Sequence, residues 1–110
     1  SREIKHIIRR LTREDEDKAF QDVMALKPAT FRYKRRLHDG SLVDDPSQPL
    51  RRGLIYEDAP ESIRGEDKTL VVDERIVNTE LALKAALRQL EELEERYRKL
   101  KAKRKSDEAR

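Results

Sequence analysis

The C-terminal third of the chain carries apolar or small residues at steps of three and four, and this period limits the fold more than any other feature. We call this stripe the seam, and it consists of Ile76, Leu83, Ala86, Leu90, Leu93, Tyr97 and Leu100, with Thr79 filling the remaining position. A seven-residue repeat of this kind is typical of helices that supercoil around one another. We therefore predict one coiled-coil helix over residues 73–105, followed by a disordered tail at 106–110.

The seam has to be buried against another apolar surface, and the composition indicates which chain provides that surface. Of the 110 residues, 45% are charged and 35% are hydrophobic, which leaves a thin interior for a chain of this length. Either the helix packs on its own small domain, or partner chains cover it. Because the rest of the chain supplies too few apolar residues for the whole stripe, we favour partner chains. Leu and Ala at these positions do not choose between a dimer and a trimer.

The residues before the helix predict a small head at 1–72. Thr12, followed by a run of acids, is a helix cap whose acids meet the positive end of the helix dipole, and Pro28 ends that helix. Residues 29–37 then alternate as a strand does, and residues 53–56 and 69–72 read as two further short strands. The predicted fold class is α+β, with a head of short strands and one or two helices before the long helix.

Several classes of function are disfavoured. The chain has no Cys, and His6 and His38 lie far apart in sequence, so we expect no metal site and no cofactor. No apolar run approaches the roughly 20 residues that span a bilayer, so we expect no membrane partner. The basic tail, from Arg96 to Lys105, reads either as a solvated helix end or as a nucleic-acid patch. With a net charge of only +3 and little aromatic interleaving, we expect no nucleic-acid partner.

The first six residues bring together a hydroxyl, a carboxylate, an amine and an imidazole, on Ser1, Glu3, Lys5 and His6. A lysine whose ammonium is desolvated can lose its proton and act as base toward a serine hydroxyl. Any lysine-rich surface also produces such neighbours, so the composition alone does not establish a catalytic pair.

Three segments and the long helix occur in an order that resembles a known family. They are Ser-Arg-Glu-Ile-Lys at 1–5, Ala-Leu-Lys-Pro-Ala-Thr-Phe-Arg-Tyr-Lys at 25–34, and Gly-Leu-Ile-Tyr-Glu-Asp-Ala-Pro-Glu at 53–61. The chain resembles, over residues 1–93, the self-cleaving intramolecular chaperone domain at the C-terminus of phage endosialidases, tailspikes, tail fibres and neck appendages.

The resemblance implies a homotrimer whose helices wrap together while the heads grip the end of an upstream fibre or spike of the same polypeptide. It also implies a serine-lysine dyad, with Ser1 as nucleophile and Lys5 as general base, and a chain that is the released product. In the family the lysine follows the serine by five residues, whereas Lys5 follows Ser1 by four. Two assignments of the nucleophile therefore stay open. It is either Ser1, with a serine-to-lysine spacing shorter by one residue, or the residue just before Ser1. The implied location is the host cytoplasm during virion assembly, with release from the mature fibre.

The alternative to a self-cleaving chaperone is a non-catalytic coiled-coil oligomerisation or adaptor module. It needs the seam but neither Ser1 nor Lys5. Substitution of both residues in a longer chain distinguishes the two functions.

Overall fold

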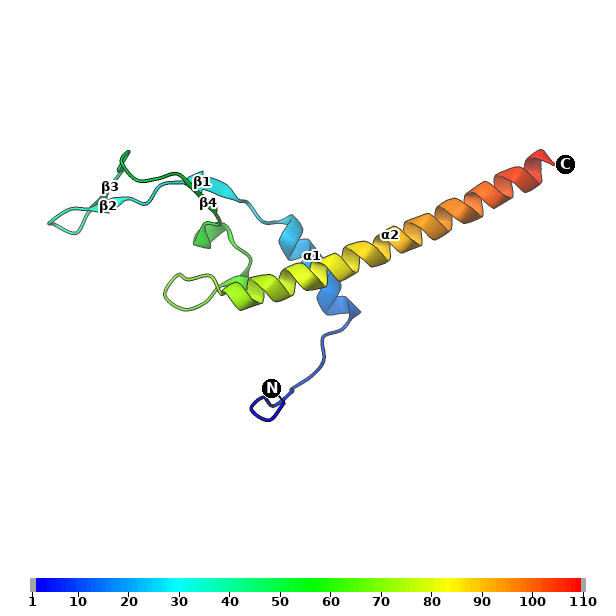
Figure 1. Ribbon diagram of the computed structural model, residues 1–110, viewed down its shortest axis with the longest axis horizontal. Coiled ribbons are helices and arrows are strands. Elements are labelled where there is room, and N and C mark those ends of the chain that lie inside the picture. Colours follow the sequence, from blue (N-terminus) through cyan, green and yellow to red (C-terminus); the bar gives the residue numbers. More distant parts are fainter. Residues whose placement is uncertain (1, 110) are drawn as a thin grey trace. The chain divides into compact units, whose positions relative to one another are not determined.

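The structure, a computed structural model, describes residues 2–109 and has the predicted α+β composition (Figure 1). It consists of two compact units: residues 2–24 with 73–109, which we call the helical unit, and residues 25–72, which we call the strand unit. In chain order the elements are α1 (Arg13–Met24), β1 (Ala29–Phe31), β2 (Arg35–Arg36), β3 (Leu42–Val43), β4 (Arg51–Gly53), the 3₁₀ turns η1 (Tyr56–Asp58) and η2 (Glu61–Ile63), and α2 (Val72–Glu108).

Helix α1 begins where the sequence predicts. Thr12 is the residue before the helix, and three acids occupy the first turn, where they meet the positive end of the helix dipole. The helix ends at Met24, before Pro28, and buries Ala19 and Asp22. Residues 2 to 11 form neither helix nor strand.

Helix α2 runs for 37 residues and extends beyond both predicted ends. It continues through residues 106–108, which we had predicted to lie in a disordered tail. No Gly or Pro occurs after residue 65, so the local sequence provides no helix stop before the end of the chain. Lys105 in the last turn is also favourable at the negative end of the helix dipole.

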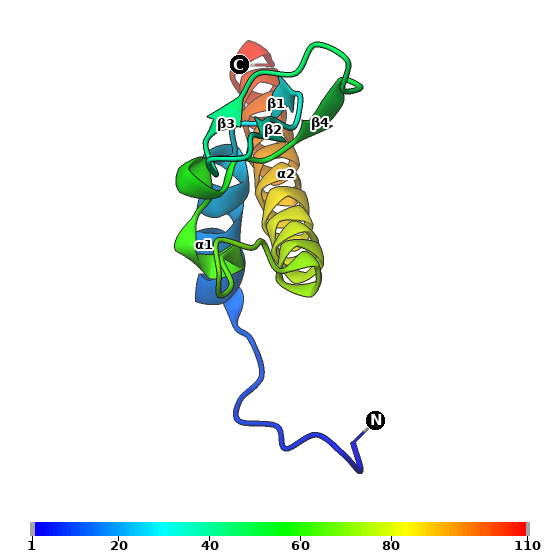
Figure 2. The ribbon, with the colours of Figure 1, turned by 90° about the vertical axis from the view of Figure 1, so that its left-hand side faces the viewer.

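The division into units differs from the predicted head at 1–72, because α1 belongs with α2. Figures 1 and 2 both show α1 lying against α2, and Figure 1 shows that it crosses the N-terminal half of the longer helix. Ala19 is buried on α1, and Ala82 and Ala85 are buried on α2.

The strand unit consists of two separate pairs of very short antiparallel strands. β1 pairs with β4, placing Phe31 opposite Arg51, and β2 pairs with β3 across the turn at Gly40. The strand predicted at 29–37 is therefore split in two. The strand predicted at 53–56 instead occupies Arg51–Gly53, since Tyr56 already begins η1.

The predicted third strand at 69–72 reduces to one bridge between Arg64 and Leu70. Asp67 and Lys68 both have positive φ, of 53° and 56°, and the Thr69 amide donates to the Glu66 carbonyl at 3.1 Å. Two successive positive φ values define the tight turn that suits antiparallel neighbours. Val72 then enters α2, so the segment has no room for a longer strand.

Candidate functional site

Of the two residues predicted to be catalytic, the structure describes one. Lys5 is exposed in the irregular segment before α1, whereas Ser1 lies outside the described residues. Every residue from 2 to 11 is exposed, and Ile4 and Ile8 have 82% and 85% of their surface accessible. A lysine becomes a base only where water is removed from its ammonium. Lys5 is exposed to water in the described part of the chain.

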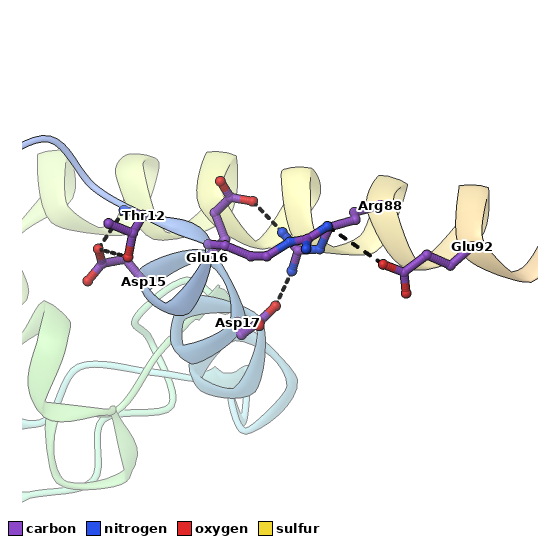
Figure 3. Close-up of polar contacts among 7 residues, drawn as sticks. Thr12, Asp15, Glu16, Asp17, Arg88 and Glu92 are labelled. Atoms are coloured by element: carbon purple, nitrogen blue, oxygen red, sulfur yellow. Dashed lines mark hydrogen bonds and ion pairs between the residues drawn. The ribbon is translucent and has the colours of Figure 1, made fainter.

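The segment that carries Lys5 ends in a polar cap on α1 (Figure 3). The Asp15 carboxylate accepts hydrogen bonds from the Thr12 amide at 2.6 Å and from the Thr12 hydroxyl at 3.0 Å. It also accepts two parallel bonds from the Arg9 guanidinium, at 2.8 and 2.9 Å. The hydrogen bond from Arg9, followed by those from Thr12, lowers the pKa of Asp15 far below its ordinary value. The start of α1 is therefore fixed by side chains close in sequence.

Arg88 joins α2 to the first turn of α1, and we call this arrangement the clamp. Its guanidinium donates to the Glu16 carboxylate at 2.8 Å and also to the Asp17 carboxylate (Figure 3). Only 17% of the Arg88 side chain and 16% of the Glu16 side chain are exposed, so this pair is shielded from water. A longer pair, of 3.7 Å, joins Arg13 to Glu92 one turn further along α2. The clamp thus fixes where α1 crosses α2.

The seam residues lie outside this crossing. Large seam side chains remain between 51% and 67% exposed from one end of α2 to the other, and Ala86 is half-buried. At about 100° per residue, the seam lies roughly 150° around α2 from the face of Ala85 and Arg88. The contact with α1 therefore leaves the predicted stripe open.

Sequence reasoning missed two residues of this site. Leu87 is 50% exposed and widens the seam, since it follows Leu83 by four residues and precedes Leu90 by three. A strict two-in-seven pattern omits it, although the same three-and-four spacing identifies it. Arg88 was missed because its partners lie in α1, and no local pattern predicts which face of α2 contacts another helix.

Other kinds of site find no support in the described part of the chain. Residues 2–109 contain no group of three His, Cys, Asp or Glu side chains able to hold a metal ion. None of the helices described is both long and apolar enough to cross a membrane. In the basic tail, Arg98 pairs with Glu94 at 4.0 Å and with Glu95 at 3.3 Å, so part of that charge is neutralised locally.

In comparisons with known proteins, no family model, no curated protein and no solved structure matches this chain. A function is therefore proposed from the chain's own residues and from the resemblance stated above.

Proposed function

We propose that the chain is an intramolecular chaperone that trimerises through the seam and holds an upstream phage tail fibre, spike or appendage in register while it folds. It acts in the host cytoplasm during virion assembly. It is then released from the fibre by autoproteolysis with Ser1 and Lys5.

The observation that carries this proposal is the exposure of the seam along α2. A helix with a continuous apolar stripe gains roughly 1.5–3 kcal/mol for each large side chain that it buries fully. The contact with α1 does not use this stripe, and the clamp holds α1 on another face. Copies of the same chain offer a matching stripe at the same helical period, and three chains joined at one end stay aligned for the slow, non-local pairing of a fibrous shaft.

The release step uses the peptide bond on the N-terminal side of Ser1. The Ser1 hydroxyl oxygen attacks the carbonyl carbon of the preceding residue while Lys5 takes the hydroxyl proton. Lys5 passes that proton to the Ser1 nitrogen, which leaves as a free amine, and an ester joins the upstream chain to Ser1. Water then hydrolyses the ester and restores the hydroxyl. Because Lys5 is exposed here, the base has to be desolvated by the upstream chain or by a neighbouring protomer before release.

The test uses a longer chain that includes the residues upstream of Ser1. We expect Ser1→Ala and Lys5→Met each to abolish the split, measured by mass spectrometry, while the neighbouring control His6→Asn still splits. If Lys5→Met abolishes the split and Ser1→Ala does not, the nucleophile is the residue before Ser1. Splitting in both variants would rule out the dyad.

The exposure of Lys5 also favours a second candidate, the non-catalytic coiled-coil oligomerisation or adaptor module. This module keeps the seam and its oligomer but leaves the longer chain intact. Analytical ultracentrifugation together with an intact-mass measurement of the longer chain therefore distinguishes the two candidates.

A further inference from the structure

Positively charged side chains cluster on the strands of the strand unit, and they have no role in the function proposed above. Residues 27–53 contain seven Lys or Arg and three Asp. Five of these are arginines on or beside the paired strands, and all five are exposed. We call this group the arginine ribbon, and it consists of Arg32, Arg35, Arg36, Arg51 and Arg52.

The arginine ribbon interacts only weakly with one carboxylate of the strand unit: the pKa of Asp45 is lowered chiefly by hydrogen bonds from Ser47 and least by the charge of Arg35. Among the described residues none of its members forms an ion pair with a carboxylate; Arg32 donates instead to the Gln48 carbonyl at 3.1 Å, and Arg36 to the Gly40 carbonyl at 2.8 Å. Two of the three nearby aspartates accept hydrogen bonds within turns. Asp39 accepts from the Ser41 hydroxyl at 2.6 Å, and Asp45 accepts from the Ser47 hydroxyl.

The backbone and one aromatic ring hold parts of this surface in place. Arg51 lies directly opposite Phe31 in the ladder, and its guanidinium carbon is 5.7 Å from the centre of the Tyr33 ring. The Tyr33 ring in turn meets Phe31 edge-on, with centroids 5.3 Å apart. A guanidinium stacked in this way keeps its hydrogen-bond donors free and loses less freedom when it binds a planar anion.

The surroundings favour a protein carboxylate over a nucleic-acid phosphate as that anion. An open pocket beside the ribbon is bordered by Arg32 and Lys34 but also by Asp44 and Asp45, and Leu50 adds an apolar side chain to it. A phosphate backbone carries uniform negative charge and is repelled by the two aspartates. A folded protein surface can place carboxylates against the arginines and apolar groups against Leu50.

We propose that the arginine ribbon docks on a carboxylate-bearing face of the upstream shaft of the same polypeptide. This inference rests on the proposed function, because it names the chemistry of the surface that the chaperone holds. The shaft is the occupant we favour, because a partner joined covalently is present at high effective concentration and needs only modest charge pairing to dock. Guanidinium groups also pair with carboxylates through two parallel bonds, which fixes the register of the partner.

The first test is zero-length carbodiimide crosslinking of the uncleaved chain with its upstream residues, followed by peptide mapping. This reagent joins a lysine amine to a carboxylate in contact with it. We expect Lys34, beside the ribbon, to be joined to upstream Asp or Glu residues, whereas Lys101 and Lys103 in the basic tail are not. Crosslinks from the tail lysines alone would overturn the proposal.

The second test compares two pairs of charge reversals with the same change in net charge, Arg35→Glu with Arg51→Glu and Lys101→Glu with Lys103→Glu. We expect the ribbon pair to lower the yield of protease-resistant shaft about tenfold while the trimer persists, and the tail pair to leave the yield unchanged. Equal effects of both pairs would refute a specific role for the ribbon. A chain that stays monomeric but still crosslinks through Lys34 would refute the proposed function and leave the docking surface standing. Tight binding of duplex DNA that the ribbon pair abolishes, with no crosslink at Lys34, would assign the ribbon to nucleic acid instead.

Discussion

The Arg88 guanidinium lies 2.8 Å from the Glu16 carboxylate, although the two residues are 72 positions apart in the chain. This pair places the start of α1 against the middle of α2, and the second carboxylate, on Asp17, completes the contact. The consequence for the proposed function is that α1 occupies one face of α2 while the seam stays available for other chains.

The clamp predicts the stability of the helical unit. We expect Arg88→Met to lower the free energy of unfolding by about 1–2 kcal/mol, because it leaves the poorly exposed Glu16 carboxylate without its partner. The matched control is Arg98→Met, whose side chain is 71% exposed and whose pairs lie within α2. Urea denaturation followed by circular dichroism measures both, and equal losses would show that the clamp contributes no more than a surface ion pair.

Asp15 predicts how the helical unit responds to acid. Its folded pKa is lowered, chiefly by the Arg9 hydrogen bond and then by Thr12, so folding favours the ionised carboxylate. This contribution to stability is complete above the unfolded aspartate pKa of about 3.9 and is lost as pH falls below it toward the lower folded value. Unfolding curves between pH 6 and pH 2, at constant ionic strength, measure the loss as a function of pH.

Asp15→Asn is the control for this acid dependence, since it keeps the shape of the side chain but cannot ionise. We expect the variant to be less stable than the parent at pH 6 and to lose less stability on acidification. The pKa values of Asp39 and Asp45 are also lowered, by hydrogen bonds from Ser41 and Ser47, so some acid dependence remains. If the free energy of unfolding of Asp15→Asn depends on pH as steeply as that of the parent, the cap does not contribute to the acid dependence of stability.

The surroundings of Gly65 predict that the turn before α2 tolerates a larger side chain poorly. A methyl group at this position would lie 2.8 Å from the Thr69 hydroxyl oxygen and 2.9 Å from a Val71 methyl carbon, both closer than packing allows. We expect Gly65→Ala to destabilise the strand unit by about 1–3 kcal/mol, as overpacking does. Adding Val71→Ala removes one of the two clashes, so the double variant should recover part of the loss. Thermal denaturation measures the stability of each variant. If the double variant loses as much stability as the two single substitutions together, the clash with Val71 is not the cause.

The features that the sequence predicted are those set by neighbouring residues. The helix begins directly after Thr12 with acids in its first turn, as the order of residues indicates, and Asp15 accepts from Thr12 within that turn. The long helix is equally local, because its period persists and no stop residue interrupts it. The sequence could not show which side of the long helix contacts α1. The choice of Ala85 and Arg88 for that contact depends on the positions of Glu16 and Asp17.

The strands were harder to predict for a physical reason. Phe31 and Tyr33 alternate as in one continuous strand, but the ladder of β1 ends at Phe31, and the Tyr33 ring packs edge-on against Phe31 and beneath Arg51. Pairing also depends on residues far along the chain, since β1 meets β4 and not the strand that follows it. Alternation predicts that a segment is extended, but it does not give the partner or the length of the ladder.

The seam provides the prediction on which the proposed function depends most directly. Leu90 is 51% exposed in the single chain and occupies the middle of the seam. Leu90→Asp replaces a side chain worth about 2 kcal/mol on burial with a carboxylate that has no partner there. We expect the parent chain to sediment as a trimer at micromolar concentration and the variant to sediment as a monomer.

The control is Lys99→Asp, an equally drastic change of an exposed residue that lies across α2 from Leu93 and Tyr97 and about three turns beyond Arg88. It should leave the trimer intact, since position 99 faces solvent in the proposed assembly. The circular dichroism of both variants should keep the helical signal of α1, because the clamp does not involve the seam. If Leu90→Asp associates as the parent does, the exposed stripe is not the oligomer interface, and the chaperone proposal loses the observation that supports it.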